Sequence, residues 1–285
     1  MSLVNPLPQA RNYQRINVQP RAGALGAQIS GVDLSAAMDD ALFAEIKQAF
    51  HDHLVIVLRK QSIKPQDLVA FAKRFGPVES HPLGSRRGLE DHPEVMVLEN
   101  KAGKLGPRND FWHSDISFGV QPPLGSILYA ITVTEGRADT MFCNMYRAYE
   151  GLSAGLRDML DKMTAMHSAE KIVQEVPNRF AVDVAPPAVE HPVVRTHIGT
   201  GRKALYVNPH YTLNFKNWTR EDSEPLLKML AARATAAENI YRHQWQVGDV
   251  LMWDNRCTMH YAVRDYDDSM PRFMHRTTAA GDIPH

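Results

Sequence analysis

The C-terminal part of the chain constrains the fold more than any other stretch. Short segments rich in β-branched and aromatic residues follow one another there, separated by tight turns such as Gly248-Asp249. The segments are YRHQWQV (241–247), DVLMWDN (249–255), CTMHYAV (257–263) and RFMHRTT (272–278). Consecutive short strands predict an antiparallel sandwich or barrel. Since helical patterns occur elsewhere in the chain, the expected fold class is α+β, with helices flanking the β core.

Upstream of these strands, helical and β-rich patterns alternate. Apolar residues recur at helical spacing, which predicts helices over 39–53, 65–75, 146–163 and 221–237. Runs rich in β-formers predict strands over 54–58, 94–100 and 126–133. The sequence contains no fixed repeat and no long linker, so we expect a single domain spanning residues 1–285.

Composition excludes several classes of protein. Lys plus Arg and Asp plus Glu each number 32 in 285 residues, so the formal charge is zero and nothing favours binding to nucleic acid. The apolar runs are far shorter than the roughly 20 residues of a membrane span, and residues 1–21 are too polar for a secretory signal. We therefore expect a cytoplasmic protein. With two cysteines only, any metal site must use His and carboxylates.

Two His-x-acid pairs are candidate metal ligands. They are His92-Pro-Glu94 and His113-Ser-Asp115, and in a strand residues i and i+2 project from the same face. The second pair is the better candidate because it lies among alternating aromatic and polar residues, whereas Pro93 and the acidic residues around it indicate an exposed turn. On spacing alone, a histidine with a hydrogen-bonding neighbour is the more frequent case.

A third ligand and a cationic pair are found near the C-terminus. His260 follows the segment DVLMWDN and lies in a β-rich region. Arg272 and Arg276 bracket RFMHR close by, and a guanidinium suits a dicarboxylate through paired hydrogen bonds. This combination favours a metal site with an anionic co-substrate.

Stretches along almost the whole chain carry a family resemblance. They are GALGAQISGVDL (23–34), LVIVLRKQ (54–61), FAKRFGPVESHP (71–82), NDFWHSDISF (109–118), ADTMFCNMYRAYEGLS (138–153), KALYVN (203–208), WDNRCTMHYAVRDY (253–266) and PRFMHR (271–276). With these motifs in this order, the sequence resembles the TauD/TfdA family of iron(II)- and 2-oxoglutarate-dependent dioxygenases. The resemblance implies a double-stranded β-helix, the jelly-roll or cupin-like core, flanked by helices.

The resemblance also implies roles for individual residues. His113, Asp115 and His260 correspond to the iron ligands, Thr140 to the threonine that contacts 2-oxoglutarate, and Arg272 to the arginine that pairs with its distal carboxylate. The implied cofactors are Fe(II), 2-oxoglutarate and O2. The implied reaction hydroxylates an aliphatic carbon and releases succinate and CO2.

Ordinary structural roles also explain the two residues assigned to the co-substrate. Thr140 fits a hydroxyl at a strand edge, and Arg272 fits a surface ion pair with Asp265 or Asp267. The turn at 136–140 reads Gly-Arg-Ala-Asp-Thr where many members of the family have Gly-Gly-Asp-Thr. Since alanine adopts positive φ less readily than glycine, we expect this turn to differ.

The substrate is expected to be a small organic anion. His81, Asn109 and Arg276 resemble the substrate site of taurine dioxygenase, although His81 also fits a solvated loop residue and Asn109 a turn cap. After His81, residues 83–93 lack the aromatic residue of taurine enzymes and resemble members that act on larger anions. Candidate substrates are sulfonates such as taurine, alkyl sulfates and aryloxyalkanoates.

Two segments have open roles, and two other functions remain possible. The Pro-rich segment 173–194 predicts a mobile lid or an ordered surface loop. Residues 205–218 predict a cavity lining or an oligomer interface, and the family resemblance implies a homo-oligomer, a dimer or a tetramer. The same His/Asp/His triad also suits a zinc hydrolase, or the chain is a non-catalytic barrel that binds 2-oxoglutarate.

Overall fold

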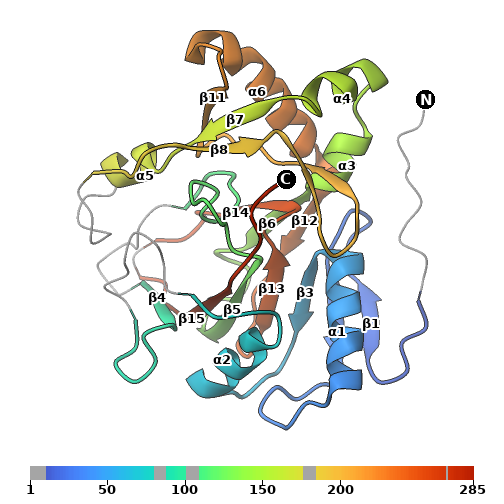
Figure 1. Ribbon diagram of the computed structural model, residues 1–285. Coiled ribbons are helices and arrows are strands. Elements are labelled where there is room, and N and C mark those ends of the chain that lie inside the picture. Colours follow the sequence, from blue (N-terminus) through green and yellow to red (C-terminus); the bar gives the residue numbers. More distant parts are fainter. Residues whose placement is uncertain (1–10, 80–87, 101–108, 176–183, 268) are drawn as a thin grey trace.

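A seven-stranded sheet forms the larger part of the β core (Figure 1). In spatial order its strands are β1 (Asn17–Pro20), β2 (Ala27–Ser30), β3 (Val55–Leu58), β13 (Val250–Asp254), β5 (Gly125–Thr132), β15 (Arg272–Ala279) and β4 (Met96–Asn100). Neighbours pair antiparallel except β2 and β3. The structure, a computed structural model, describes residues 11–79, 88–100, 109–175, 184–267 and 269–285.

A second sheet faces the first and completes the jelly roll. Its strands are ordered β12 (Ile240–His243), β6 (Thr140–Asn144) and β14 (Thr258–Ala262). Apolar side chains of both sheets form one buried cluster, which includes Leu128, Leu251 and Trp253 from the large sheet and Phe142 and Met259 from the small one. The predicted α+β class with a double-stranded β-helix core is confirmed.

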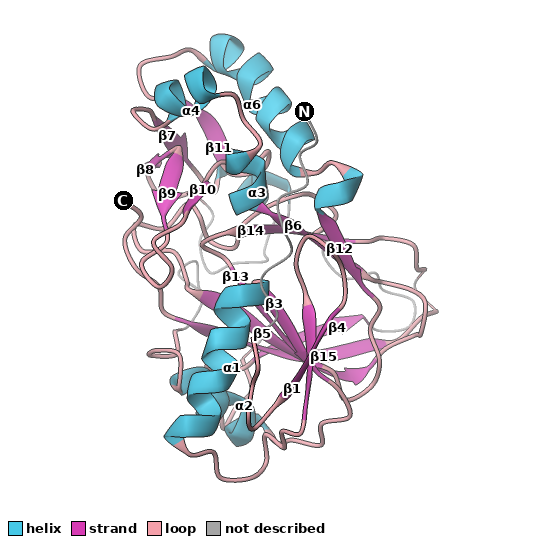
Figure 2. Ribbon diagram, turned by 90° about the vertical axis from the view of Figure 1, so that its right-hand side faces the viewer, coloured by secondary structure: helices cyan, strands magenta, loops and turns pink. Residues whose placement is uncertain are grey.

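Two helices cover the outer face of the large sheet (Figure 2). They are α1 (Asp40–His53), whose N-cap Asp39 accepts a hydrogen bond from Leu42 N, and α2 (Pro65–Lys73), which begins with proline. Strand β3 is buried on both sides: Val55 and Val57 face the inter-sheet core, while Ile56 and Leu58 pack under the helices. A strand buried on both faces needs such a continuous apolar run.

The remaining elements lie at the other end of the molecule, in the upper part of Figure 1. The helices are α3 (Met145–Glu150), α4 (Ala154–Leu160), α5 (Glu170–Glu175), α6 (Arg220–Ala234) and the 3-10 turn η1 (Ala237–Asn239). One small sheet has the order β11 (Thr212–Phe215), β7 (Thr164–His167), β8 (Val189–Pro192), and another pairs β10 (Lys203–Leu205) with β9 (Val194–Thr196). Strand β8 and the start of β9 therefore occupy the C-terminal end of the predicted lid, 173–194, of which residues 176–183 lie outside the described part.

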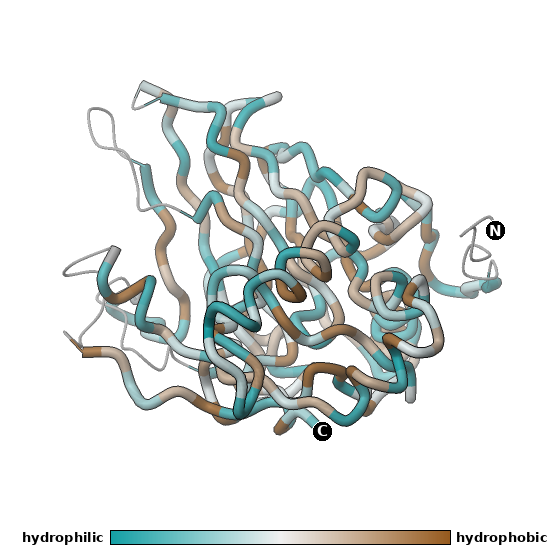
Figure 3. The backbone as a smooth tube through the Cα atoms, turned by 90° about the horizontal axis from the view of Figure 1, so that it is seen from above, coloured by the Kyte–Doolittle hydropathy of each residue, from teal (hydrophilic) through white to brown (hydrophobic). Residues whose placement is uncertain are grey.

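Most of the predicted helices and strands are present, but the prediction of one helix is wrong. The helix expected over 146–163 is two helices, because Gly151 caps the end of α3 and the Ser153 side chain caps the start of α4 by accepting from Leu156 N at 3.4 Å. Figure 3 shows short hydrophobic and hydrophilic stretches interspersed along the described backbone. Within the described ranges, no helix has the length and apolar content to cross a membrane.

Candidate active site

The two histidines of the predicted triad are held together by backbone pairing. His113 precedes β5 and forms an antiparallel bridge with His260 of β14. His113 N donates to His260 O at 3.1 Å, and His260 N donates to His113 O at 2.8 Å. The small sheet thus fixes the spacing of two imidazoles that are far apart in the sequence.

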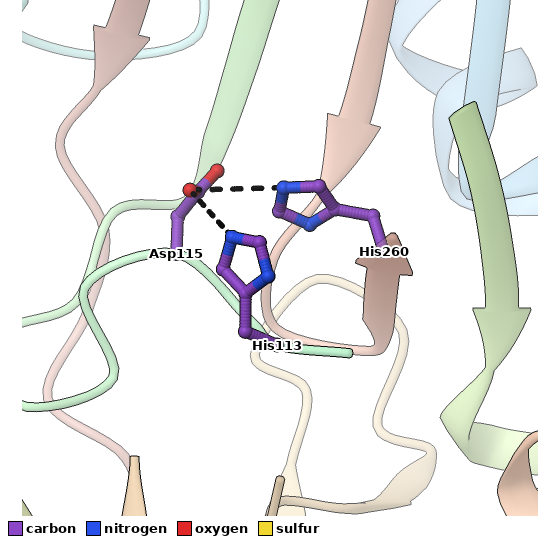
Figure 4. Close-up of side chains that lie close together, drawn as sticks. All are labelled: His113, Asp115 and His260. Atoms are coloured by element: carbon purple, nitrogen blue, oxygen red, sulfur yellow. Dashed lines mark ion pairs between the residues drawn. The ribbon is translucent and has the colours of Figure 1, made fainter. Parts of the chain in front are cut away.

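Asp115 completes a compact group of three side chains (Figure 4). Its Oδ1 lies 3.8 Å from Nε2 of His113 and 3.8 Å from Nε2 of His260. All three residues are buried, and one ligand atom from each lies within 4.8 Å of the others. The structure therefore brings together the three residues predicted as ligands.

Both imidazoles are in the state that binds a metal. Burial is the main cause that lowers the pKa of His113 to about 3 and that of His260 to about 4, so both rings are neutral at physiological pH. The Nδ1 atom of His113 lies 2.9 Å from the carbonyl oxygen of Phe111 and donates its proton there. Nε2 of His113 then carries the lone pair and points toward Asp115.

Asp115 is an ionised carboxylate. Burial alone raises its pKa, but Arg276, His260 and His113 together lower it below its usual range. The closest cation is Arg276, whose Nη2 lies 2.9 Å from Asp115 Oδ2. Two neutral imidazoles and one carboxylate form a donor set that suits Fe(II) or Zn(II).

Thr140 lies inside a sheet and not at its edge. It belongs to β6, the central strand of the small sheet, where it pairs with His243 on one side and Ala262 on the other. Its hydroxyl oxygen accepts a hydrogen bond from Nε1 of Trp245 at 3.0 Å. The strand-edge explanation is therefore wrong.

Arg272 begins β15 and has no carboxylate partner in the described part of the chain. Asp265 instead lies 3.4 Å from Arg242, and Asp267 accepts from Ser269. Nε of Arg272 is buried without a hydrogen bond, and burial lowers the pKa of the guanidinium. A buried, unpaired cation is costly, so this position is suited to an anion.

The turn before Thr140 keeps a left-handed residue despite the missing glycine. Gly136 has φ 74° and Ala138 has φ 55°. Ala138 N donates to Asp265 Oδ1 at 2.7 Å, which holds the alanine in this conformation. Alanine thus adopts a positive φ in this turn, although it does so less readily than glycine.

The three predicted substrate residues have different outcomes. His81 lies outside the described residues. The backbone carbonyl oxygen of Asn109 accepts a hydrogen bond from Ala262 N at 3.2 Å. Arg276 contacts Asp115, and its Nε is buried without a hydrogen bond. Aromatic rings adjoin the site: the ring centroids of Phe111 and Tyr211 lie 4.8 Å and 5.8 Å from that of His113.

Sequence reasoning missed two polar residues that support Asp115. Ser126 Oγ lies 2.8 Å from Asp115 Oδ2, and Asn255 Oδ1 accepts from Asp115 N at 3.3 Å. The available signal was a single serine in the run GSILYAI (125–131), whose other residues are aliphatic, glycine or tyrosine.

The alternative pair, His92 and Glu94, is partly exposed, and Nδ1 of His92 lies 3.7 Å from Oε1 of Glu94. Among the described residues, this pair joins no group of three possible metal ligands.

A second group of three possible ligands, formed by His197, Asp254 and Cys257, does not suit a metal. Nδ1 of His197 accepts from the backbone N–H groups of Gly199 and Thr200, and its Nε2 lies 3.0 Å from Asp254. Neither imidazole nitrogen is left for an ion.

Comparisons with known proteins agree with this geometry. The family described as taurine catabolism dioxygenase TauD, TfdA family matches residues 17–278. The alpha-ketoglutarate-dependent sulfate ester dioxygenase of Pseudomonas putida is 34% identical, over 98% of this chain and 94% of its own length. The alpha-ketoglutarate-dependent 2,4-dichlorophenoxyacetate dioxygenase of Cupriavidus pinatubonensis is 33% identical, over 90% of this chain and 94% of its own.

Solved structures show the same fold. A taurine dioxygenase from Burkholderia xenovorans has a TM-score of 0.82 and 34% identity, covering 95% of this chain and 93% of that one. AAD-2 in complex with Mn(II) and N-oxalylglycine has a TM-score of 0.78 and 29% identity, covering 95% and 99%. The chain therefore belongs to the taurine catabolism dioxygenase TauD/TfdA family and is a 2-oxoglutarate-dependent dioxygenase.

Proposed function

We propose that this dioxygenase uses Fe(II) and O2 to hydroxylate an aliphatic carbon of a small organic anion, with release of succinate and CO2. The observation that carries the proposal is the buried His113, Asp115 and His260 group together with Arg272, whose Nε is buried and has no hydrogen-bond partner among the described residues. When bound, Fe(II) supplies the redox chemistry that couples oxidation of 2-oxoglutarate to hydroxylation. We further propose that residues 1–285 act as one catalytic domain in a homo-oligomer.

The proposed role of Arg272 is to bind the distal carboxylate of 2-oxoglutarate, with Thr140 as a second contact. Support comes from the burial of Arg272 Nε without a partner and from the Thr140 hydroxyl, which is free to donate because it accepts from Trp245. The neighbour bound to Mn(II) and N-oxalylglycine, an isostere of 2-oxoglutarate, adds to this support. A zinc hydrolase would leave Arg272 without an anionic partner.

The proposed substrate is an alkyl sulfate or an aryloxyalkanoate with an apolar part. Arg276 has a buried, unbonded Nε and would bind the anionic head group. The rings of Phe111 and Tyr211 beside His113 would contact the apolar part and exclude water. Hydroxylation of the carbon next to the ester or ether oxygen gives an unstable product, which collapses to a carbonyl compound and releases sulfate from an alkyl sulfate or a phenol from an aryloxyalkanoate.

A succinate assay with a substrate panel tests this proposal. The purified chain is incubated with Fe(II), 2-oxoglutarate and O2, and with an alkyl sulfate, an alkanesulfonate, taurine or an aryloxyacetate in turn. Succinate formed in equal amount to the released sulfate or phenol supports the proposal. Release of sulfate without O2 and 2-oxoglutarate contradicts it and points to a hydrolase.

A further inference from the structure

We propose that Ser126 is a positioning residue for the metal-binding carboxylate of Asp115. This inference rests on the proposed metal site. It assigns to Ser126 the task of holding one oxygen of Asp115, so that only the other oxygen faces the metal. Ser126 itself contacts neither metal nor substrate.

The Ser126 hydroxyl contacts three polar side chains, of which Asp115 and Asn255 are buried and Arg276 is partly buried. Ser126 is the second residue of β5 and is fully buried. Its Oγ lies 2.8 Å from Asp115 Oδ2, 3.0 Å from Arg276 Nη2 and 3.3 Å from Asn255 Nδ2. The hydroxyl thus joins the metal ligand to a cation and to a side-chain amide.

Chemistry dictates the direction of each of these hydrogen bonds. Arg276 has donors only, so the Ser126 oxygen accepts from it. Asn255 Oδ1 accepts from Trp253 Nε1 and from Asp115 N, which are both obligate donors, so its Nδ2 faces Ser126 and donates. A hydroxyl has two acceptor sites and one proton, and both acceptor sites are taken. The single proton of Ser126 therefore goes to Asp115 Oδ2.

The consequence is a carboxylate with two different oxygens. Oδ2 accepts from Ser126 and forms an ion pair with Arg276 Nη2 at 2.9 Å, whereas Oδ1 lies 3.8 Å from each histidine Nε2. A carboxylate held in this way binds a metal through one oxygen. The 2-His-1-carboxylate arrangement needs its remaining positions open for co-substrate and oxygen, and a second carboxylate oxygen on the metal would close one of them.

The character of β5 supports a specific role for the hydroxyl. Its neighbours Gly125, Ile127 and Leu128 are apolar and buried, and a buried hydroxyl is unfavourable unless it is fully hydrogen-bonded. Outer-shell groups of this kind orient metal ligands, and their loss typically weakens metal binding about 10- to 100-fold.

The experiment compares the affinity of metal-free, full-length variants for Mn2+. Free Mn2+ is measured by electron paramagnetic resonance, with no turnover involved. Ser126→Ala should bind Mn2+ about 10- to 100-fold more weakly than the wild type. Ser114→Ala is the matched control, because the hydroxyl of the buried Ser114 donates to the Thr258 carbonyl at 2.7 Å and not to the Asp115 carboxylate; the Mn2+ affinity of this variant should stay within about threefold.

Two further readouts separate positioning from folding. Ser126→Cys keeps a side chain of similar size with a weaker donor, so it should show a smaller loss, and it replaces the alanine variant if that variant does not fold. The Co(II) absorption spectrum should change in intensity in the Ser126 variants, since a second Asp115 oxygen alters the coordination, but not in Ser114→Ala.

The outcomes distinguish this inference from the proposed function. Wild-type affinity and an unchanged Co(II) spectrum in folded Ser126 variants would overturn the role of Ser126, while the metal site would stand. If His113→Ala binds Mn2+ as tightly as the wild type, the metal lies elsewhere, and both the proposed metal site and this inference fail.

Discussion

His113 and His260 are neighbours across a β-bridge, with ring centroids 4.1 Å apart. Each residue donates its backbone N–H to the carbonyl oxygen of the other. The spacing of these two proposed ligands is thus set by the same hydrogen bonds that build the small sheet. A site fixed by backbone pairing forms with the fold and needs no metal to bring the imidazoles together, which favours tight binding of the ion.

Arg272, whose Nε has no hydrogen-bond partner in the part of the chain that the structure describes, is predicted to have a strong effect on co-substrate binding. Replacing it in Arg272→Gln should raise the KM for 2-oxoglutarate about 10- to 100-fold, because a hydrogen bond to a charged group contributes about 1.5–3 kcal/mol. Metal affinity should not change. Steady-state kinetics and Mn2+ titration check both statements. Arg202→Gln, which removes a half-exposed partner of Glu150, is the control; an unchanged KM in Arg272→Gln would move the co-substrate pocket elsewhere.

Arg276 is expected to act on two partners. Arg276→Ala removes the proposed contact to the substrate head group and also the cation 2.9 Å from Asp115 Oδ2. The KM for the prime substrate should rise about 10-fold or more, and Mn2+ affinity should also fall. Kinetics with the best panel member, together with metal titration, measure the two effects. A variant that loses affinity for 2-oxoglutarate alone would show that the roles of the two arginines are reversed.

The residue pattern predicted strands at the core and helices around it, and the family resemblance supplied the jelly roll and the triad, but neither revealed the surroundings of the triad. The strands that carry His260 and Arg272 have clear β patterns, and His113-x-Asp115 has a recognisable spacing. Strand β6, which contains Thr140, was missed because TMFCN is short and its neighbours in the sheet are distant in sequence. Local patterns do not reveal such non-local partners.

The contacts of Ser126 and the helix break at Ser153 were missed for different reasons. Ser126 acquires its role only when β5 lies beside Asp115 and Arg276, which is a tertiary event. The break was visible in principle, since Gly151 and Ser153 are ordinary helix stop and start signals. The apolar periodicity of 146–163 continues across these residues, so periodicity alone does not show the break.

Ala138 predicts a stabilising substitution. A non-glycine residue in the left-handed region lowers the free energy of unfolding by about 1–2 kcal/mol. Glycine avoids this strain but lowers the same free energy by about 0.5–1 kcal/mol, because it makes the unfolded chain more flexible. Ala138→Gly, at φ 55°, should therefore raise the free energy of unfolding by about 0.5–1 kcal/mol. Urea denaturation measures it. Ala232→Gly, on the exposed face of α6, should lower it by about 1 kcal/mol; the same sign in both variants would contradict the account.

The buried imidazole of His167 predicts acid sensitivity. Burial, followed by the neighbouring His191, lowers the pKa of His167 to about 3 from 6.5. Between these values the unfolded chain binds the proton and the folded chain does not. The contribution of the neutral His167 to the free energy of unfolding is thus fully present above pH 6.5. It is lost as the pH falls toward 3, by about 1.4 kcal/mol per pH unit.

Removing that imidazole should reduce the pH dependence. In His167→Gln the difference in unfolding free energy between pH 6.5 and pH 5 should shrink by about 2 kcal/mol relative to the wild type. Urea denaturation of the metal-free proteins at the two pH values measures this difference. The control is His285→Gln at the exposed C-terminal residue. Equal pH dependence in the wild type and His167→Gln would show that His167 is not neutral and buried in the folded protein.

The most direct test of the central claim is anaerobic absorption spectroscopy of the metal-free protein. Addition of Fe(II) and then 2-oxoglutarate should produce the visible charge-transfer band of an iron–2-oxoglutarate chelate, and a true substrate from the panel should shift it. Asp115→Ala should give no band, since it lacks the proposed carboxylate ligand, whereas His92→Ala should match the wild type. A full band in Asp115→Ala, or none in a wild-type protein that has bound Fe(II), would contradict the account.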